Sequence, residues 1–598
     1  MTAIITHWKH FFKSTDKSVK LRFAGIALLI LLASLGASVL ILNRPKTEDQ
    51  RFRDFTEQIF CRELSGNTLN LHYTLADPSD YGIDDSNITL GTMDQASWAA
   101  SSMQAENYLS SLAQFSREEL SPENQLTYDV LADYLNTSLE GADFYLYEEP
   151  LSPTLGIQAQ LPVLLAEYTF RTKKDIEHYL QLLTTVPEYF QSIINFEKQK
   201  ASSGLFMSDT CVNDILKQCD SFVQSGDDNY LRQLFDDQID SFTNLTIDEK
   251  ISYKQQNLDI LSAYVIPAYQ DLMTELANLL GSGKNSGGLC HFPQGKEYYT
   301  YLVHSTTGDA SGIEQIEARI KEEIVEVYQD VQELLSSDHG LTTISLDGYE
   351  SPEPEEILTQ LQEVITQDFP APPDVSFEVK YVHESLQDYL SPAFYLIPPI
   401  DDTEHNVIYI NPASNYNALE LYTTLAHEGY PGHLYQTVTF EEYNDEPLRS
   451  ILNFGGYTEG WATYVEMYAY STWPENATLA AIYQKDRSLM LGIASLLDIG
   501  IHYRGYTRSQ VAQFLEKFGI AKEASDALYT NILESPANYL KYYVGYLNFQ
   551  DLQTYLANQM GDQFSLKEYH ARVLAIGPCS FTVLKHYLTD QNYIDSIA

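Results

Sequence analysis

The sequence predicts a mainly α-helical fold: two large helical lobes, a small β-sheet, and one transmembrane helix in front of them. Three observations carry this prediction. Long segments space their apolar residues three and four apart, one short run is rich in β-branched and aromatic residues, and one charge-free apolar run lies near the N-terminus. With 598 residues, the chain is long enough for a large buried core and more than one lobe.

The apolar run is the first element. Phe23–Leu42 contains no charged residue, and twenty apolar residues in a helix match the hydrocarbon thickness of a bilayer. Basic residues precede the run, whereas basic and acidic residues are mixed after it, which favours a cytoplasmic N-terminus. We therefore expect a cytoplasmic tail at residues 1–22, a signal anchor at 23–43 and an extracytoplasmic domain at 44–598, held in the cell membrane by one pass. A cleaved signal peptide is the alternative, but its small-residue site, Ser34 to Gly36, lies inside the run.

Helical patterns dominate the first half of the domain. Asp175–Lys200 and Ile251–Leu280 both space apolar residues for one helical face. A loop rich in glycine and serine follows at Gly281–Gly288 and is the expected seam between lobes at roughly 44–285 and 286–598.

The strand prediction rests on one segment. Asn406–Asn411 is rich in β-branched and aromatic residues, and its neighbour Ser391–Pro399 also has an extended character. Helical patterns resume at Ala418 and continue to the C-terminus. The small sheet is therefore expected directly before the segment that carries the chemistry.

Charge and cysteine content exclude two classes of function. The formal net charge is −47, and nucleic-acid binding needs lysine and arginine to contact phosphates, so we expect no nucleic-acid partner. The five cysteines form no CxxC pair, so a cysteine zinc site is not expected either.

Residues 423–436, TTLAHEGYPGHLYQ, carry the first chemical motif. Zinc takes neutral imidazoles in a tetrahedral set, and a carboxylate beside the metal can remove a proton from water. His427 and His433 are the candidate ligands and Glu428 the candidate general base. The histidines are six residues apart, which leaves them about 120° out of phase on a regular helix. We expect a bulge at Pro431-Gly432 to bring His433 back toward the metal.

The second motif is YTEGWATYVE at residues 457–466. Glu459, twenty-six residues after His433, is the expected third ligand of one zinc ion per chain, and cobalt or manganese could replace zinc in vitro. Glu466 lies about two helical turns further on. It either orients a ligating histidine or is a surface carboxylate. If the His-Glu pair stood alone, a capped helix end with buried histidines would be an equal alternative to a metal site.

These motifs, together with DIGIHYRGYT and PANYLKYYVGYL, resemble the bacterial domain of unknown function 885 family. The resemblance runs from near Phe55 to the segment HARVLAIGPCSFTVL, which ends at Leu584. That family is similar to the helical gluzincin peptidases, such as carboxypeptidase Taq and angiotensin-converting enzyme. The resemblance implies a metallopeptidase-like fold with a deep cleft between helical lobes and the sheet beside it.

The resemblance also implies the ligands His427, His433 and Glu459 with Glu428 as the base. It further points to Asp498, His502, Tyr542 and Gly545 in the later motifs. Of these, His502 and Tyr542 are the candidate donors to an oxyanion. The alternative for His502 is a hydrogen-bonded structural histidine, and Tyr542 could equally be one of the chain's 44 tyrosines without a catalytic role. The chain departs from the family at Pro536-Ala537, where Pro-Gly is usual, and at Gly577 to Ser580.

We therefore expect a membrane-anchored zinc metallopeptidase that acts on short peptides, in the manner of a carboxypeptidase or dipeptidase. Strand 406–411, with Tyr409 and Asn411, either pairs with the peptide substrate or is an ordinary core strand. An exopeptidase would need a charged group to hold the terminus of its peptide substrate. Three arginines are available for this: Arg504, Arg508 and Arg572. The alternatives are a non-catalytic surface protein on a peptidase fold and a zinc hydrolase of a non-peptide amide, such as a cell-wall linkage. A structural zinc site fits poorly, because a free carboxylate beside three ligands describes an open site.

Overall fold

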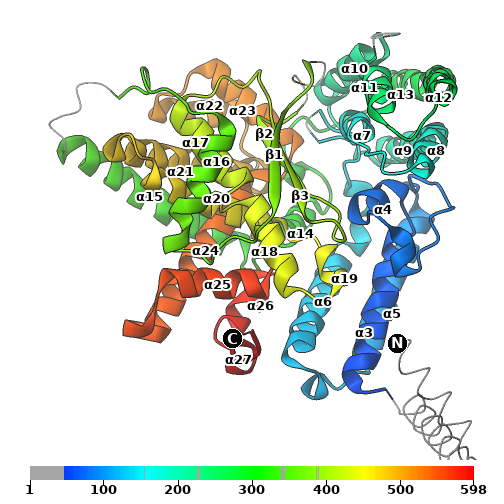
Figure 1. Ribbon diagram of the computed structural model, residues 1–598. Helices are drawn as coiled ribbons and strands as arrows, with labels where there is room; N and C mark the ends of the chain where they lie inside the picture. Colours follow the sequence, from blue (N-terminus) through cyan, green and yellow to red (C-terminus); the bar gives the residue numbers. More distant parts are fainter. Residues whose placement is uncertain are drawn as a thin grey trace, which may run out of the picture. The chain divides into compact units, whose positions relative to one another are not determined.

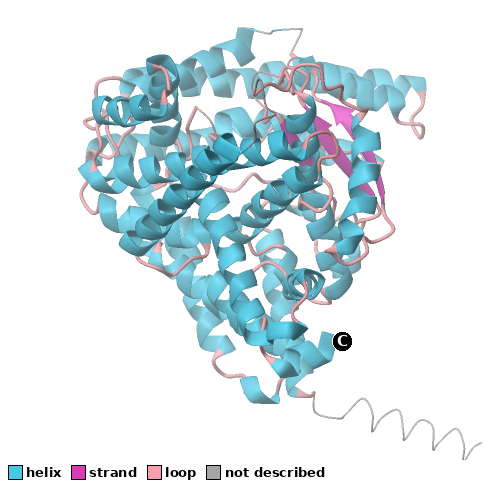
Figure 2. Cartoon of the chain, turned by 90° about the vertical axis from the view of Figure 1, so that its left-hand side faces the viewer, coloured by secondary structure: helices cyan, strands magenta, loops and turns pink. Residues whose placement is uncertain are grey.

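Helices form most of the described chain, as the apolar spacing predicts (Figure 2). The structure is a computed structural model, and it describes residues 46–597 apart from 154, 225, 227–228, 338–343, 385–386 and 388–389. The chain divides into two units, Met1–Asp54 and Phe55–Ala598, and the second contains every element of the site. Within the described residues, no helix combines the length and the apolar character needed to cross a bilayer. The anchor expected at residues 23–43 lies outside the described residues.

The first half of the domain is a series of helices, several of which begin with a polar cap. Thr246 and Glu249, for example, form a capping box at the start of α12, which satisfies its free N–H groups. The helices are α3 (Glu48–Leu64), α4 (Thr68–Thr74), α5 (Gln95–Leu112), α6 (Pro122–Glu140), α7 (Ile157–Ala166), α8 (Lys173–Leu183), α9 (Val186–Ser203), α10 (Asp209–Gln224), α11 (Tyr230–Ser241), α12 (Ile247–Ile260) and α13 (Ile266–Asn278).

The second half contains the helices that build the site. Helix α20 packs against α17, α21 and α24, and α21 packs against α15. The bounds are α14 (Gly295–Thr307), α15 (Ile313–Ser337), α16 (Pro354–Val364), α17 (Ala418–Glu428), α18 (His433–Tyr443), α19 (Pro447–Ser450), α20 (Gly455–Thr472), α21 (Ala477–Ile499), α22 (Arg508–Leu515), α23 (Lys522–Glu534), α24 (Asn538–Met560), α25 (Leu566–Ile576), α26 (Phe581–Tyr587) and α27 (Gln591–Ile597).

A three-stranded sheet lies beside α16 and α17 (Figure 1). Its strands are β1 (Ser376–Tyr381), β2 (Ala393–Leu396) and β3 (His405–Ile410), in the order β1-β3-β2. Strand β3 pairs parallel with β1 and antiparallel with β2. The sheet and the strand at 406–411 are thus confirmed, whereas β1 was not predicted. The central place of β3 leaves it no free edge, so the proposed pairing of β3 with a substrate is wrong.

The two faces of the sheet belong to two hydrophobic cores. Ile408 and Ile410 of β3 pack into the larger core, which also holds buried residues of α17, α20 and α24. Tyr409 packs into the other core, which is built mainly from α7 to α13. The alternation of side chains along a strand therefore decides which residues of β3 face the chemical centre. The larger core also takes Leu126 and Val130 from α6, and the lobe boundary near residue 285 stays a prediction.

Candidate metal centre

His427 lies in the last turn of α17. Asn417 and Glu420 form a capping box that fixes the start of this helix. The Nδ1 atom of His427 lies 3.1 Å from Oε2 of Glu466, and its Nε2 atom lies 3.7 Å from Oε2 of Glu459. Since Glu466 takes Nδ1, the imidazole presents Nε2 toward the other candidate ligands.

His433 opens a separate helix. Helix α17 ends at Glu428 and α18 begins at His433, so the two histidines do not share one bulged helix as the spacing suggested. Residues Gly429 to Gly432 connect the two helices. The indole N–H of Trp461 donates to the carbonyl of Pro431 in this connector at 2.9 Å. A Cβ atom on Gly432 would lie 1.8 Å from the carbonyl oxygen of His427. Only glycine lets the chain return this closely to the end of α17.

Glu459 completes a group of three ligand atoms. Its Oε2 atom lies 3.7 Å from Nε2 of His427 and 3.5 Å from Nε2 of His433, and all three atoms lie within 4.8 Å of one another. Ligand atoms around a tetrahedral zinc ion at 2.0–2.2 Å lie about 3.4 Å apart. The residues present therefore fit a small divalent metal ion in both donor type and spacing.

The carboxylates around the histidines create a strongly cation-attracting centre. Burial alone would lower the pKa of His427, but the neighbouring carboxylates of Glu459 and Glu466 raise it to about 10. The pKa of Glu459 lies well below its usual range, because both histidines bond to it and outweigh the opposite effect of burial. A metal ion that binds here must therefore displace a proton from His427.

Glu466 is buried and fixed by Arg487. The Nε atom of Arg487 donates to Glu466 Oε1 at 2.7 Å, while His427 occupies Oε2. Burial raises the pKa of Glu466, yet the charge of Arg487 and the bond to His427 bring it down to about 2. The sequence left open whether Glu466 contacts a ligating histidine or is a surface carboxylate. The structure shows the contact with His427. Arg487, on α21, has no motif of its own and was not predicted.

Glu428 is held by the edge of the sheet. Its carboxylate is buried, and the backbone N–H of Tyr395 on β2 donates to Oε2 at 2.9 Å. Burial raises the pKa of Glu428, although the charges of His427 and His433 act in the opposite direction. A carboxyl with a raised pKa beside the ligand group is suited to accept and return a proton. Sequence reasoning missed Tyr395, because a backbone donor leaves no trace in the residue type.

Helix α24 brings two further polar side chains to the centre. The Nζ atom of Lys541 lies 3.4 Å from Oε1 of Glu459. Burial raises the pKa of Tyr542, and the adjacent carboxylates Glu459 and Glu428 raise it further. Tyr542 is thus placed beside the ligand and base candidates. Gly460 and Gly545 allow this, because a Cβ on either would lie within 2.6 Å of the other helix.

Two residues suggested by the resemblance have a structural role instead. Both ring nitrogens of His502 have backbone partners. Nε2 lies 2.9 Å from the Ile532 carbonyl oxygen, and Nδ1 accepts from the Leu289 N–H at 3.3 Å. Asp498 accepts from the Tyr299 hydroxyl and from the N–H of Ala537, just before α24. The proposed catalytic role of His502 is therefore corrected, and Asp498 supports the start of α24.

Two residues of the predicted substrate strand also belong to the scaffold. Tyr409 points into the core built from α7 to α13 and donates its hydroxyl hydrogen to Glu167 at 2.5 Å. The amide of Asn411 donates to the Gln387 and Leu390 carbonyls, which precede β2 in the sequence. The expected roles of Tyr409 and Asn411 in binding the substrate or supporting a metal ligand are therefore corrected, because both side chains bond to the scaffold.

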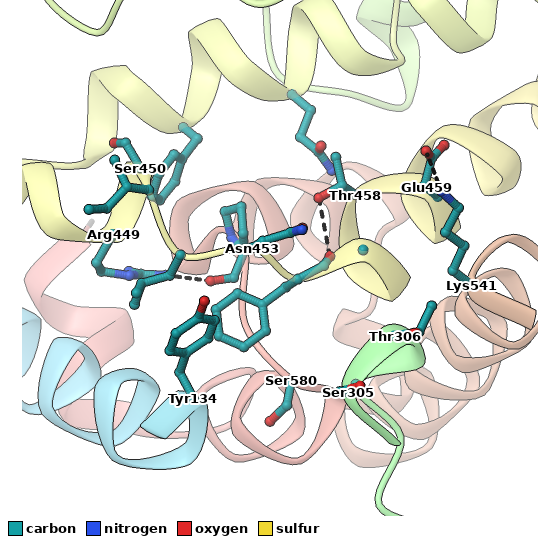
Figure 3. Close-up of a pocket in the computed structure, with 18 of the residues that line it drawn as sticks. Tyr134, Ser305, Thr306, Arg449, Ser450, Asn453, Thr458, Glu459, Lys541 and Ser580 are labelled. Carbon is teal, nitrogen blue, oxygen red and sulfur yellow. Dashed lines mark hydrogen bonds and ion pairs between the residues drawn. The ribbon is translucent and has the colours of Figure 1, made fainter. Parts of the chain in front are cut away.

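A cavity of about 710 Å³ borders the centre, with Glu459 and Lys541 on one side and Arg449 and Ser450 on the other (Figure 3). A second cavity, of about 1090 Å³, shares wall residues with the first, among them Ile397 directly after β2. Glu459, one of the three ligand candidates, therefore borders a cavity large enough for several residues of a peptide.

The fold and the site together define a large helical protein with a grouped His–His–Glu centre beside a cavity. The chain belongs to the family described as bacterial protein of unknown function (DUF885), whose model matches residues 78–588. The resemblance noted in the sequence is thereby confirmed. The search of curated proteins returned no match.

Two solved structures share the fold of this chain, and a third has a much lower structural similarity. A candidate lipoprotein of Colwellia psychrerythraea has a TM-score of 0.79 at 21% identity, covering 91% of this chain and 98% of that one. A candidate lipoprotein of unknown function from Shewanella oneidensis has a TM-score of 0.62 at 17% identity, covering 91% and 100%. A candidate oligoendopeptidase F of Bacillus anthracis scores 0.32 at 10% identity, covering 83% and 94%.

Proposed function

We propose that this chain is a zinc metallopeptidase that hydrolyses short peptides. The observation that carries the proposal is the position of Glu428: its carboxylate is fixed beside His427, His433 and Glu459 but is not part of their group. Three ligands with an adjacent, separately held carboxylate describe a catalytic arrangement. A binding protein on the same scaffold would have no use for a buried base.

Each residue of the centre has a chemical part in hydrolysis. A bound zinc ion would supply the Lewis acidity that polarises a carbonyl and acidifies water. Glu428 takes the proton of the attacking water, whose hydroxyl stays on the acyl carbon while the C–N bond breaks and the proton passes to the amine. Tyr542 donates to the oxyanion as it develops, and Glu466 keeps His427 in the required orientation.

The edge of the sheet offers a place for the peptide backbone. The N–H of Tyr395 points away from β3 toward Glu428, so this edge of β2 lies beside the base. An extended peptide that adds to a free strand edge gains main-chain hydrogen bonds without depending on its sequence. We therefore assign to β2 the role that the sequence suggested for β3.

We propose that the protein lies outside the cytoplasm and is attached to a membrane. Two proteins of the same fold are candidate lipoproteins, and lipoproteins are held at membranes by lipid anchors. The apolar run Phe23–Leu42 would hold this chain at a membrane as a helical anchor.

Hydrolysis of a peptide pool tests the proposal directly. The purified chain is loaded with zinc and incubated with N-acetylated heptapeptides of mixed sequence, and the products are identified by mass spectrometry. We expect cleavage that stops with a chelator and returns with added zinc. A zinc-loaded chain that cleaves no peptide, but releases an amine from cell-wall fragments, would replace the peptidase with an amidohydrolase of another linkage.

A further inference from the structure

A terminus-specific peptidase needs a charged group inside its cavity, and the arginines named from the sequence do not supply it. Arg504 pairs with Glu317 at 2.7 Å, and Arg508 donates to the Asp526 carbonyl at 2.8 Å. Arg572 pairs with Glu568 and also donates to a backbone carbonyl. All three are engaged by neighbours, and none of them lines the cavity beside the metal centre.

Lys541 is the cation that lines this cavity next to the ligand group (Figure 3). Its Nζ atom lies 3.4 Å from Oε1 of Glu459, whereas Oε2 of the same carboxylate faces His427 and His433. Nζ also lies 5.0 Å from the centroid of the Tyr542 ring. An ammonium group has three N–H donors, and the contact with Glu459 uses at most one of them. Lys541 is therefore held in place with donors left for a ligand.

Gln436 supplies a second donor from another helix. It lies on α18, three residues after His433 and thus on the same face of the helix. Its side chain lines the cavity and is only 3% exposed, and its Nε2 atom has no hydrogen-bond partner among the described residues. Leaving a buried donor unpaired is unfavourable, so this amide indicates a polar ligand that completes it.

Apart from Glu459, which contacts Lys541 through Oε1 and faces the two histidines through Oε2, the ionisable groups of the cavity do not add a second counter-charge to Lys541. Burial raises the pKa of Glu441 to about 7 and also raises the pKa of Asp133, so both carboxyls hold protons more readily than usual. His304 lies 2.9 Å from Glu140, and Arg449 is bound to the Ile576 and Pro578 carbonyls. In a chain with a net charge of −47, an ammonium group in a cavity is a localised site for an anion.

We propose that Lys541 and Gln436 bind the C-terminal carboxylate of the substrate, which makes the enzyme a carboxypeptidase. The inference rests on the peptidase function proposed above. Lys541 supplies the charge and Gln436 a directed N–H, a combination that recognises a carboxylate over a neutral amide. Because both lie beside the metal centre, the bond that breaks lies at a fixed, short distance from the C-terminus of the peptide.

Three heptapeptide pools test the assignment on the full-length, zinc-loaded chain. The first pool has free C-termini and no acidic residues, the second has the same sequences as C-terminal amides, and the third consists of amides with glutamate as the last residue. We expect efficient cleavage of the first pool only, at one fixed position from the C-terminus. Equal cleavage of the first two pools overturns the anchor but leaves the peptidase in place. Equal cleavage of the first and third overturns the terminal assignment in favour of an acidic side chain.

Lys541→Met separates substrate binding from support of Glu459. We expect kcat/KM for the free-acid pool to fall by roughly ten- to a hundredfold, mainly through KM, since a charge-assisted hydrogen bond is lost. Cleavage of the amide pool and the zinc content should not change, and Lys517→Met, at an exposed position, serves as the matched control. Gln436→Leu should shift KM in the same direction by less. An equal loss on both pools, or a loss of zinc from Lys541→Met, would show that Lys541 acts only through Glu459 and would overturn the proposal.

Discussion

His427 is half-buried at the end of α17, where Glu459 and Glu466 surround it (the His427 cluster), whereas His502 is buried directly after α21, where Tyr299 lies between it and Asp498 (the His502 cluster). The two clusters differ in the partners of the histidine. His427 contacts the side chains of Glu459 and Glu466, which raise its pKa to about 10. His502 contacts only backbone groups through its two nitrogens, and burial lowers its pKa to about 4 although the bond to the Ile532 carbonyl acts the other way. Acidic side-chain partners and a neighbouring cavity mark a functional histidine, whereas backbone partners mark a structural one.

Glu428→Gln should give the largest effect at the His427 cluster. The amide keeps the size and the bond from Tyr395 but cannot accept a proton, so we expect the rate of peptide cleavage to fall by about 10²–10⁴-fold. Zinc content, measured by elemental analysis, should stay at the level of the parent chain. Substantial residual turnover in a zinc-loaded variant would remove Glu428 from the role of general base.

Glu466→Gln tests whether the carboxylate behind His427 tunes the metal. Loss of the charge that orients His427 should weaken zinc binding by about 10–100-fold, as measured by competition with a chromogenic chelator. Asp498→Asn is the matched control, because Asp498 is also a buried carboxyl but belongs to the His502 cluster. If both variants bound zinc like the parent, the contact between Glu466 and His427 would have no functional meaning.

His502→Ala should affect stability and leave the metal alone. The substitution leaves the Leu289 N–H and the Ile532 carbonyl without their partner, which costs about 1–3 kcal/mol of the free energy of unfolding. Urea unfolding monitored by circular dichroism measures this change. A variant with the stability of the parent but much slower peptide cleavage would return His502 to the catalytic role that the resemblance implied.

Asp498→Asn should change how stability depends on pH. Burial raises the pKa of Asp498 to about 7, despite the hydrogen bonds from Tyr299 and Ala537 that lower it. In the unfolded chain the pKa is about 3.9, so the folded state binds this proton more tightly. Its contribution is therefore fully present below about pH 4 and is lost as the pH rises toward 7. The unfolding free energy of the parent should fall relative to Asp498→Asn across this window, and parallel pH curves would contradict the assignment.

The ligand candidates were predictable because each lies within a short motif. His427, Glu428 and His433 occupy one stretch of seven residues, and Glu459 opens a second motif with typical spacing. The helical character of the chain was equally accessible from apolar periodicity. Sequence spacing did not show that His427 and His433 belong to two helices, because the path of the connector depends on contacts with Trp461 and with the end of α17.

The remaining parts of the site depend on which elements meet in space. Tyr395 and Arg487 lie in no recognisable motif, and Lys541 lies in the motif PANYLKYYVGYL but was not singled out there. Only the packing of β2, α21 and α24 brings the three residues to the centre. Strand propensity located β3 but could not distinguish a central strand from an edge strand. The departure at Ala537 has a visible consequence: this residue has φ 63°, a left-handed conformation in which glycine is favoured.

The metal content of the purified full-length chain tests the central claim most directly. Elemental analysis of the parent and of a His427→Ala, His433→Ala double variant, both after exposure to zinc and removal of the excess, gives the answer in one comparison. We expect one zinc ion per chain in the parent and none bound at this site in the double variant, with His502→Ala retaining the full amount. A parent chain that holds no zinc under these conditions would contradict the metal centre and with it the proposed peptidase.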